Sequence, residues 1–202
     1  MALSHFFGEK SLFDLIVATI AILTGSYTLY KNFIERAKLK AFPADKLELV
    51  ISIGGGCRKM HLRVNLVNHG AKTGTLHRLE AEIANPQGKR HRFHWILFFE
   101  YLPGAVGVRP NCAPYPLSIA AKNSELLMAE FETDVKPPPS WPQGRYSVEL
   151  IGWVNRRDRR QRPNLKQTFH FDLTQGLSEQ LTEHRPTEQA EFIEVPILEW
   201  SG

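Results

Sequence analysis

The chain has 202 residues, of which 43% are hydrophobic and 23% charged, with a formal net charge of +4. Without the apolar segment near the N-terminus, about 155 residues remain, which is enough for one domain with its own core and too few for two. Residues 1–174 carry 24 Lys and Arg against 15 Asp and Glu, whereas residues 175–202 carry one Arg against six Glu. A basic body with an acidic tail favours contact with anionic surfaces, or of the tail with the body; a solvated tail fits the same numbers.

Residues 12–30 form an apolar run with a single charge, Asp14, after a short segment at 1–11. At about 1.5 Å per residue, a helix of this length crosses a ~30 Å hydrocarbon layer. The sequence therefore predicts a single transmembrane helix, because a helix bonds all its backbone polar groups internally. A cleaved signal peptide led by Lys10 is the alternative, but the apolar run is longer than usual and continues past Gly25-Ser26.

The basic residues near this helix predict its orientation. Only Lys10 precedes it, and the basic residues that follow within ten positions are Lys31, Arg36, Lys38 and Lys40. The positive-inside rule then places the C-terminal domain in the cytoplasm, where Cys57 and Cys112 would be reduced thiols. The opposite orientation would allow a disulfide between them. The sequence has no Asn-X-Ser/Thr site that would support a glycosylated exterior.

The helical pattern is expected to continue through Lys40, within a basic juxtamembrane segment at residues 31–46, before Pro43 stops it, and alternation begins at Leu47. Gly- and Asn-rich turns separate the alternating stretches, and no helical pattern lies between them. This organisation predicts an antiparallel two-sheet sandwich of about seven strands over 47–174, followed by an acidic tail at 175–202. The expected strands are residues 47–53, 60–66, 79–83, 91–99, 125–131, 146–154 and 169–173.

The strand order, and Tyr146 opening the penultimate strand after residues 141–145, resemble an immunoglobulin-like or fibronectin III-like domain. Residues 64–70 also resemble the second strand of many bacterial sandwich modules. The resemblance implies that the Tyr146 hydroxyl bonds back to the preceding connection, as in a tyrosine corner. The cysteines do not fall on the strands that carry the antibody disulfide. Because this fold hosts adhesion, chaperone, carbohydrate-binding and adaptor roles, the resemblance concerns the fold alone.

Small residues follow one stripe of the predicted membrane helix at a 4-3-4-3 spacing. Small side chains let a second helix approach closely, and a polar residue at the membrane boundary can meet a partner on the same stripe. The stripe therefore predicts self-association or a membrane partner, although an anchor that merely tolerates small residues has the same pattern. Its members are Asp14, Ala18, Ala21, Gly25 and Thr28.

An arginine-rich turn precedes the last expected strand, and guanidinium groups suit phosphate oxygens. In the resembling fold this turn lies at the domain end that faces the membrane, which predicts contact with anionic lipid headgroups. A second basic cluster, residues 89–92, would lie at the opposite end. Nucleic-acid binding is the rival interpretation, but the turn has no interleaved aromatic residues for stacking; a solvated hairpin is the plainest one. The arginines are Arg156, Arg157, Arg159, Arg160 and Arg162.

Alternation also predicts an outward apolar and aromatic face on the strands at 90–100, 146–155 and 167–173, and such a patch usually marks a contact surface. The tail at 192–200 would cover this face or bind another protein as a short linear segment. The residues expected to dock a partner are His94, Ile96, Phe98, Ile151, Trp153 and His170, with Asp172 beside them.

Searches for catalytic and metal-binding motifs find none. His91 and His94 fall on opposite faces of one strand, so no metal or other cofactor is expected. Cys112 lies in a long Pro/Gly-rich connection at 103–116, a kind of loop that is often functional, but no activating neighbour is visible. The sequence thus predicts a non-catalytic membrane protein that binds or scaffolds a partner at the membrane surface, as a subunit of an oligomer or larger complex.

Two other functions remain open. The first is a carbohydrate- or ligand-binding module facing the exterior, with Trp153 stacking on a glycan. The second is an enzyme whose site is assembled from distant residues, for example Asp172 with His170 and His94.

Overall fold

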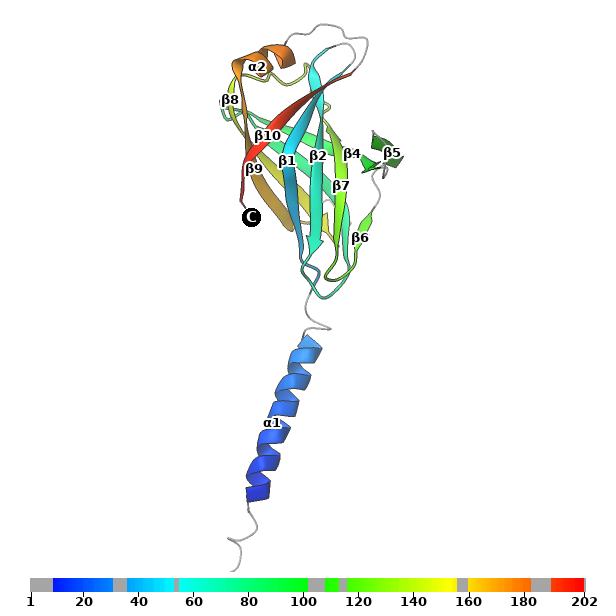
Figure 1. Ribbon diagram of the computed structural model, residues 1–202, viewed down its shortest axis with the longest axis vertical. Coiled ribbons are helices and arrows are strands. Elements are labelled where there is room, and N and C mark those ends of the chain that lie inside the picture. The colour runs from blue at the N-terminus through cyan, green and yellow to red at the C-terminus, as the bar shows by residue number, and fades with distance from the viewer. Residues whose placement is uncertain are drawn as a thin grey trace, which may run out of the picture.

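The computed structural model describes residues 9–30, 36–52, 55–101, 108–112, 116–155, 160–182 and 190–201. An N-terminal helix is followed by a β domain with one short helix of its own (Figure 1). The elements are α1 (Glu9–Leu29), β1 (Leu39–Ile51), β2 (Cys57–Asn68), β3 (Gly74–Ala84), β4 (Arg90–Tyr101), β5 (Val108–Cys112), β6 (Leu117–Ile119), β7 (Ser124–Glu132), β8 (Gly144–Val154), β9 (Leu165–Leu173), α2 (Gln175–Thr182) and β10 (Glu191–Ser201).

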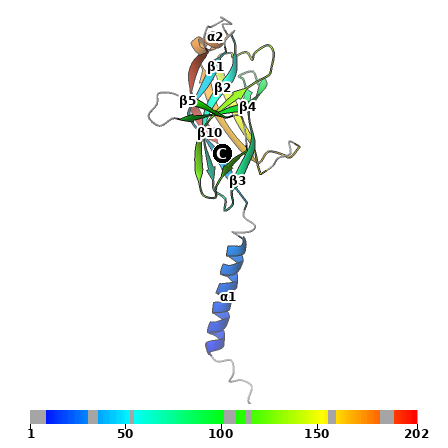
Figure 2. The same ribbon diagram turned by 90° about the vertical axis from the view of Figure 1, so that its right-hand side faces the viewer.

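The β domain is a closed antiparallel barrel of eight strands. Around the barrel the order is β1, β2, β7, β4, β3, β8, β9 and β10, and β10 pairs with β1 again. The pairing of β3 with β4, Glu80–Ala84 against Arg90–His94, closes the ring. Two short strands extend the sheet outside this ring, since β5 pairs with β4 and β6 with β3. Figure 2 shows the barrel from the side, with α1 beyond one of its ends.

The prediction of an immunoglobulin-like or fibronectin III-like sandwich is therefore wrong. Seven of the eight barrel strands were expected, but the eighth, β10, lies in the segment that the sequence analysis treated as an acidic tail. Alternation with period two buries one face of a strand equally well in a sandwich or in a barrel, so periodicity cannot distinguish them. The pairings of β10 with both β1 and β9 decide the architecture.

The boundaries at both ends of the β domain also differ from the prediction. The helical pattern expected to reach Lys40 gives way to β1, which begins at Leu39 and includes Pro43 at a register shift against β2. At the other end, residues 191–201 neither cover an outer face nor project as a linear segment, because they form a barrel strand. Ile193 and Val195 of this strand are buried in the core.

Large side chains fill the barrel interior. Trp141, Tyr146 and Phe171 pack ring against ring, with centroid distances of 5.6 and 4.9 Å, and Phe93 lies 6.3 Å from Trp141. An eight-stranded barrel is just wide enough for its own side chains to fill it. The largest fully buried side chains are Trp141, Tyr146, Phe93, Phe131, Phe169, Phe171, Leu47, Leu49, Met60, Leu62, Leu66 and Leu76.

Helix α2 covers the barrel end far from α1 (Figure 1). Leu181 enters the core, and the Ser178 hydroxyl donates to the Trp141 carbonyl over 2.6 Å. The Trp141 indole N–H donates to the Cys57 carbonyl over 3.2 Å. The Tyr146 hydroxyl donates to the Pro142 carbonyl over 2.7 Å, so the contact expected of this tyrosine is present although the fold from which it was taken is wrong. We call this the far end, and the end where β1 begins and β2 finishes the entry end.

Candidate functional site

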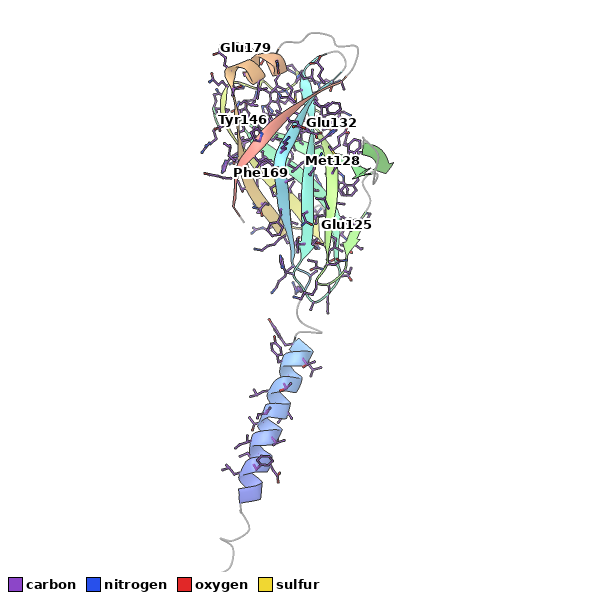
Figure 3. All side chains as sticks on the ribbon, viewed as in Figure 1. Glu125, Met128, Glu132, Tyr146, Phe169 and Glu179 are labelled. Atoms are coloured by element: carbon purple, nitrogen blue, oxygen red, sulfur yellow. The ribbon has the colours of Figure 1, made fainter. Side chains whose placement is uncertain are left out.

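Helix α1 has the properties expected of a membrane span. Its segment Leu12–Leu29 is long and apolar enough to cross a bilayer, and none of it is buried against the rest of the protein. Figure 3 shows its side chains projecting on all sides with no other element beside them. The hydroxyls of Thr19, Thr24 and Thr28 donate to the carbonyl four residues earlier, at 2.7–2.8 Å, which satisfies these polar groups within the helix.

The small-residue stripe of α1 is open. All five of its members, Asp14, Ala18, Ala21, Gly25 and Thr28, are exposed. No other part of the protein lies within 4 Å of a Cβ built on Gly25. The stripe is therefore accessible to another helix, and its role in assembly stays a prediction.

Of the arginine turn, Arg160 and Arg162 are exposed at the entry end of the barrel, whereas Arg156, Arg157 and Arg159 lie outside the described residues. Two asparagines fix the base of the turn. Asn155 and Thr75 exchange hydrogen bonds of 2.7 and 2.8 Å, and the Asn164 side chain bonds both the N–H and the carbonyl of Val154. The second basic cluster, residues 89–92, begins at the far end, opposite the turn, as expected.

The six residues expected to dock a partner do not form an exposed patch. A register shift between Trp95 and Leu97 reverses the alternation of β4, so Phe98 points inward and belongs to the core. Ile151 and Trp153 point outward, yet each is only 8% exposed. His94, Ile96 and His170 are half-buried.

The outer-face tryptophan is also unavailable as a platform for a sugar ring. The Arg78 guanidinium lies 4.8 Å from the centroid of the Trp153 ring, and the indole N–H donates to the Gln161 carbonyl over 2.7 Å. The catalytic grouping of Asp172, His170 and His94 does not assemble either. β4 and β9 are separated by β3 and β8, so His94 lies about 14 Å from β9 at the usual strand spacing, and Asp172 pairs with Arg145 instead.

A charged cluster that the sequence analysis missed lies on the outer face of β7, β2, β1 and β10. Register places Glu130, His61, Glu48 and Glu194 in one row across these strands. His61 is 6% exposed and its two ring nitrogens each lie 3.2 Å from a carboxylate, Nδ1 from Glu48 and Nε2 from Glu130. Lys59 adds a 2.7 Å ion pair to Glu130. We call these four residues, His61, Glu48, Glu130 and Lys59, the His61 cluster.

Two phenylalanines flank the His61 ring. The Phe99 ring centroid lies 4.9 Å from it and that of Phe192 lies 5.5 Å away. Phe192 is 58% exposed, whereas Met128 beside the cluster is buried. A polar hollow of about 250 Å³ opens next to the ring, and it is lined by Asp45, Lys46, Glu48, His61, Arg63, Met128 and Glu194.

The cluster favours the charged form of His61. Burial works to lower the pKa of His61, but the hydrogen bonds with Glu130 and Glu48 outweigh it and raise the pKa above 6.5. Burial likewise works to raise the pKa of Glu130, and His61 and Lys59 outweigh it and lower the pKa below 4.5. A cation fixed between two carboxylates has its ring nitrogens occupied, so this arrangement suits recognition and structure better than proton transfer.

A second charged cluster lies on the opposite outer face. Glu80 of β3 is 2% exposed, pairs with Arg78, and lies 3.3 Å from the Nδ1 atom of His94 and 3.8 Å from the Nε atom of Arg92. We call Glu80, Arg78, His94 and Arg92 the Glu80 cluster. Next to it, Glu82 pairs with Arg90 over 2.6 Å, and the arginines lower the pKa of Glu82.

The described residues contain no group of three or more His, Cys, Asp or Glu side chains arranged to hold a metal ion. Cys57 is buried and forms no disulfide, and burial raises the pKa of its thiol to about 12, so it is not a reactive nucleophile. The side chain of Cys112 lies outside the described residues.

Alternation alone could have placed Glu48, His61 and Glu130 on outward faces, because each lies between two inward apolar residues. It could not reveal that they meet, since they are far apart in sequence and their contact depends on the register of three strands. No local motif marks such a cluster.

The comparisons with known proteins identify no family. No family model matches the chain, and no curated protein matches it. A crystal structure of a Bordetella pertussis protein, provisionally assigned as ApaA, aligns with 81% of this chain and 91% of its own, at 7% identity and a TM-score of 0.33. A likeness of this size supports no conclusion on fold or function, so the function is inferred from the chain's own geometry.

Proposed function

We propose that this chain is a non-catalytic, single-pass membrane protein whose β-barrel binds a protein partner at the cytoplasmic membrane surface. The observation that carries the proposal is the pairing of an unburied apolar helix with a barrel whose interior is filled by aromatic side chains. Because side chains fill the barrel interior, its outer surface is the part that can bind a partner. The excess of basic residues after the helix supports the cytoplasmic side.

The outer face around the His61 cluster suits a protein partner best. It combines an exposed aromatic ring, Phe192, with a fixed row of charged groups, and protein interfaces favour an aromatic anchor beside satisfied polar groups. The face formed by the six residues of the original prediction offers less apolar surface, because Phe98, Ile151 and Trp153 are buried. The covered face of Trp153 also gives no support to the exterior glycan-binding alternative.

Co-purification after crosslinking in membranes tests this function. Phe192→Ser is expected to reduce the yield of the crosslinked partner several-fold. Leu198→Ser is the matched control, because Leu198 is also exposed on β10 but lies about 20 Å along the strand. Equal partner recovery from Phe192→Ser and the unmodified chain would contradict the assignment of this face.

The proposal includes assembly through the small-residue stripe of α1. Ala21→Leu with Gly25→Leu should shift crosslinked oligomers to monomer, since bulk on the stripe keeps helices apart. Thr19→Leu with Ser26→Leu adds bulk at positions about 120–140° around the helix from the centre of the stripe and should leave the oligomer intact. Unchanged oligomer size in the first variant would remove the stripe from the proposal.

A further inference from the structure

The entry end of the barrel is basic. Its described residues are 36–40, 68–75, 119–125, 154–155 and 160–165, which the pairings of β1, β2, β3, β7, β8 and β9 bring together. Glu125, labelled near this end in Figure 3, is the acidic residue among its described members. Its exposed basic side chains are Arg36, Lys38, Lys40, Lys72, Lys122, Arg160 and Arg162.

The far end has no such bias. Acidic and basic residues mix there, and Glu179 on α2 marks this end in Figure 3. Its described acidic residues are Glu132, Asp134, Asp172, Glu179 and Glu191, and its described basic residues are Arg58, Lys89, Arg90, Lys136 and Arg145. The barrel is therefore polarised along its axis, with positive charge gathered at the end joined to the membrane helix.

A single buried side chain organises the basic end. Asn68 is fully buried, and its side-chain oxygen accepts from the N–H groups of Lys38 and Gly70 at 3.2 and 3.0 Å. Its amide nitrogen donates to the Lys72 carbonyl at 2.8 Å and to the Ile119 and Ala120 carbonyls at 3.0 and 3.2 Å. One residue thus ties the entering chain, the β2–β3 connection and the turn before β7 together.

Further bonds complete this platform. The Lys122 ammonium donates to the His69 carbonyl, and the His69 N–H donates to the Lys38 carbonyl over 2.9 Å. A Cβ added to Gly70 would lie 2.4 Å from the Arg36 carbonyl oxygen, so this glycine lets the two segments touch. The basic residues therefore lie on a surface whose backbone is held in place by hydrogen bonds and close packing.

The tether brings this surface to the bilayer. Five residues separate Tyr30 from Arg36, and the six Cα-to-Cα steps of a fully extended chain span at most about 20 Å. We infer that the entry end of the barrel binds anionic phospholipid headgroups of the membrane that α1 spans. The inference rests on the membrane-spanning helix of the proposed function, and it adds lipid as a partner of the barrel itself.

The charge of the surface and its tether favour lipid over nucleic acid. Each basic residue near an anionic leaflet strengthens association about fivefold, and the effect fades beyond about 8–10 Å at physiological salt. Single-stranded nucleic acid would call for aromatic rings between the basic side chains. The rings close to them among the described residues do not form such a series. Phe42 and His69 lie edge-on to each other at 6.4 Å, and Trp153, whose indole bonds to Gln161, is only 8% exposed and lies against Arg78.

Amine labelling of the full-length chain in nanodiscs tests the inference, with mass spectrometry reading each lysine. Nanodiscs of phosphatidylcholine alone are compared with nanodiscs that also contain phosphatidylserine. Lys40 and Lys72 should be labelled about fivefold more slowly when phosphatidylserine is present. Lys89 and Lys136 at the far end serve as internal controls and should be labelled at equal rates, and high salt should abolish the protection at the entry end.

Charge reversal supplies the matched variants. In Lys40→Glu with Lys72→Glu, the phosphatidylserine-dependent protection of Lys122 should fall about fivefold or more; Lys89→Glu with Lys136→Glu should keep it. Equal labelling of the unmodified chain in both lipids would overturn the inference, and so would stronger protection of Lys40 and Lys72 by an added oligonucleotide in neutral nanodiscs. Because no other protein is present, the lipid result does not depend on whether the protein partner is found.

Discussion

The two charged clusters on the outer wall of the barrel are built in opposite senses. In the His61 cluster a buried cation lies between carboxylates that are themselves mostly buried, since the side chains of Glu130 and Glu48 are 8% and 19% exposed. In the Glu80 cluster a buried carboxylate faces partners with more exposed side chains, such as Arg92 and His94, which are 56% and 44% exposed. The central residue is buried in both clusters. The clusters differ in how easily the partner side chains could move into solvent if the central residue were lost.

This difference predicts unequal costs of disruption. Water can solvate the exposed cations around Glu80 if that carboxylate loses its charge. The carboxylates around His61 cannot turn away as freely, and without the imidazolium they would face each other at low exposure. The cost of disrupting each cluster therefore depends on the burial of the partner side chains rather than on the burial of the central residue.

The largest expected effect comes from His61→Phe. Phenylalanine keeps a ring between Phe99 and Phe192 but removes both bonds to Glu48 and Glu130, and the free energy of unfolding near pH 6 should fall by about 3 kcal/mol. His94→Phe is the control, because His94 also contacts a carboxylate but is 44% exposed, and it should cost about 0.5 kcal/mol. Denaturant unfolding of the full chain in detergent measures both, and equal losses would break the comparison.

A smaller effect is expected from Glu80→Gln. The amide keeps the shape and one acceptor for Arg78, while Arg92 and His94 turn to water, so the loss should be about 1 kcal/mol. Glu82→Gln, at a less buried carboxylate with exposed partners, should cost less still. If Glu80→Gln lowered the free energy of unfolding as much as His61→Phe does, then the burial of the central group, and not that of its partners, would determine the energetic cost.

The smallest effect is the pH dependence of the His61 cluster. Because folding raises the pKa of His61 above 6.5, its stabilisation is complete below pH 6.5 and is lost as the pH rises through the folded-state pKa. The pKa of Glu130 is lowered, so its contribution is present above pH 4.5 and is lost as the pH falls through its folded value. The free energy of unfolding should therefore fall as the pH rises above 6.5, both in the unmodified chain and in Glu80→Gln.

His61→Phe should lack this fall in the free energy of unfolding above pH 6.5. If this variant and the unmodified chain lose stability in parallel as the pH rises above 6.5, then another group is responsible and the charged state of His61 does not stabilise the barrel.

The sequence predicts the parts of this molecule that depend on local patterns. The apolar helix and the seven alternating strands follow from length, composition and a periodicity of 2. The hydrogen bond of Tyr146 to the preceding connection was also expected, as an implication of the immunoglobulin-like resemblance, and it is present although that fold is wrong. These features need no knowledge of which strand lies beside which.

The closure of the barrel and the register of its strands could not be predicted from the sequence. Residues 191–201 alternate weakly, contain Pro196 and lie in an acidic context, so they were interpreted as a tail, and without them β1 and β9 have no common neighbour. Phe98 was placed outward because a register shift in β4 has no signal in the alternation. The His61 cluster and the Asn68 platform both depend on register, which joins residues dozens of positions apart.

Alkaline carbonate extraction of membranes, followed by intact-mass analysis of the chain, tests most directly whether the barrel is held by an uncleaved membrane helix. The account predicts that the chain stays in the membrane pellet with α1 still attached. Release of the barrel into the supernatant, or a mature chain that begins after Tyr30, would contradict it.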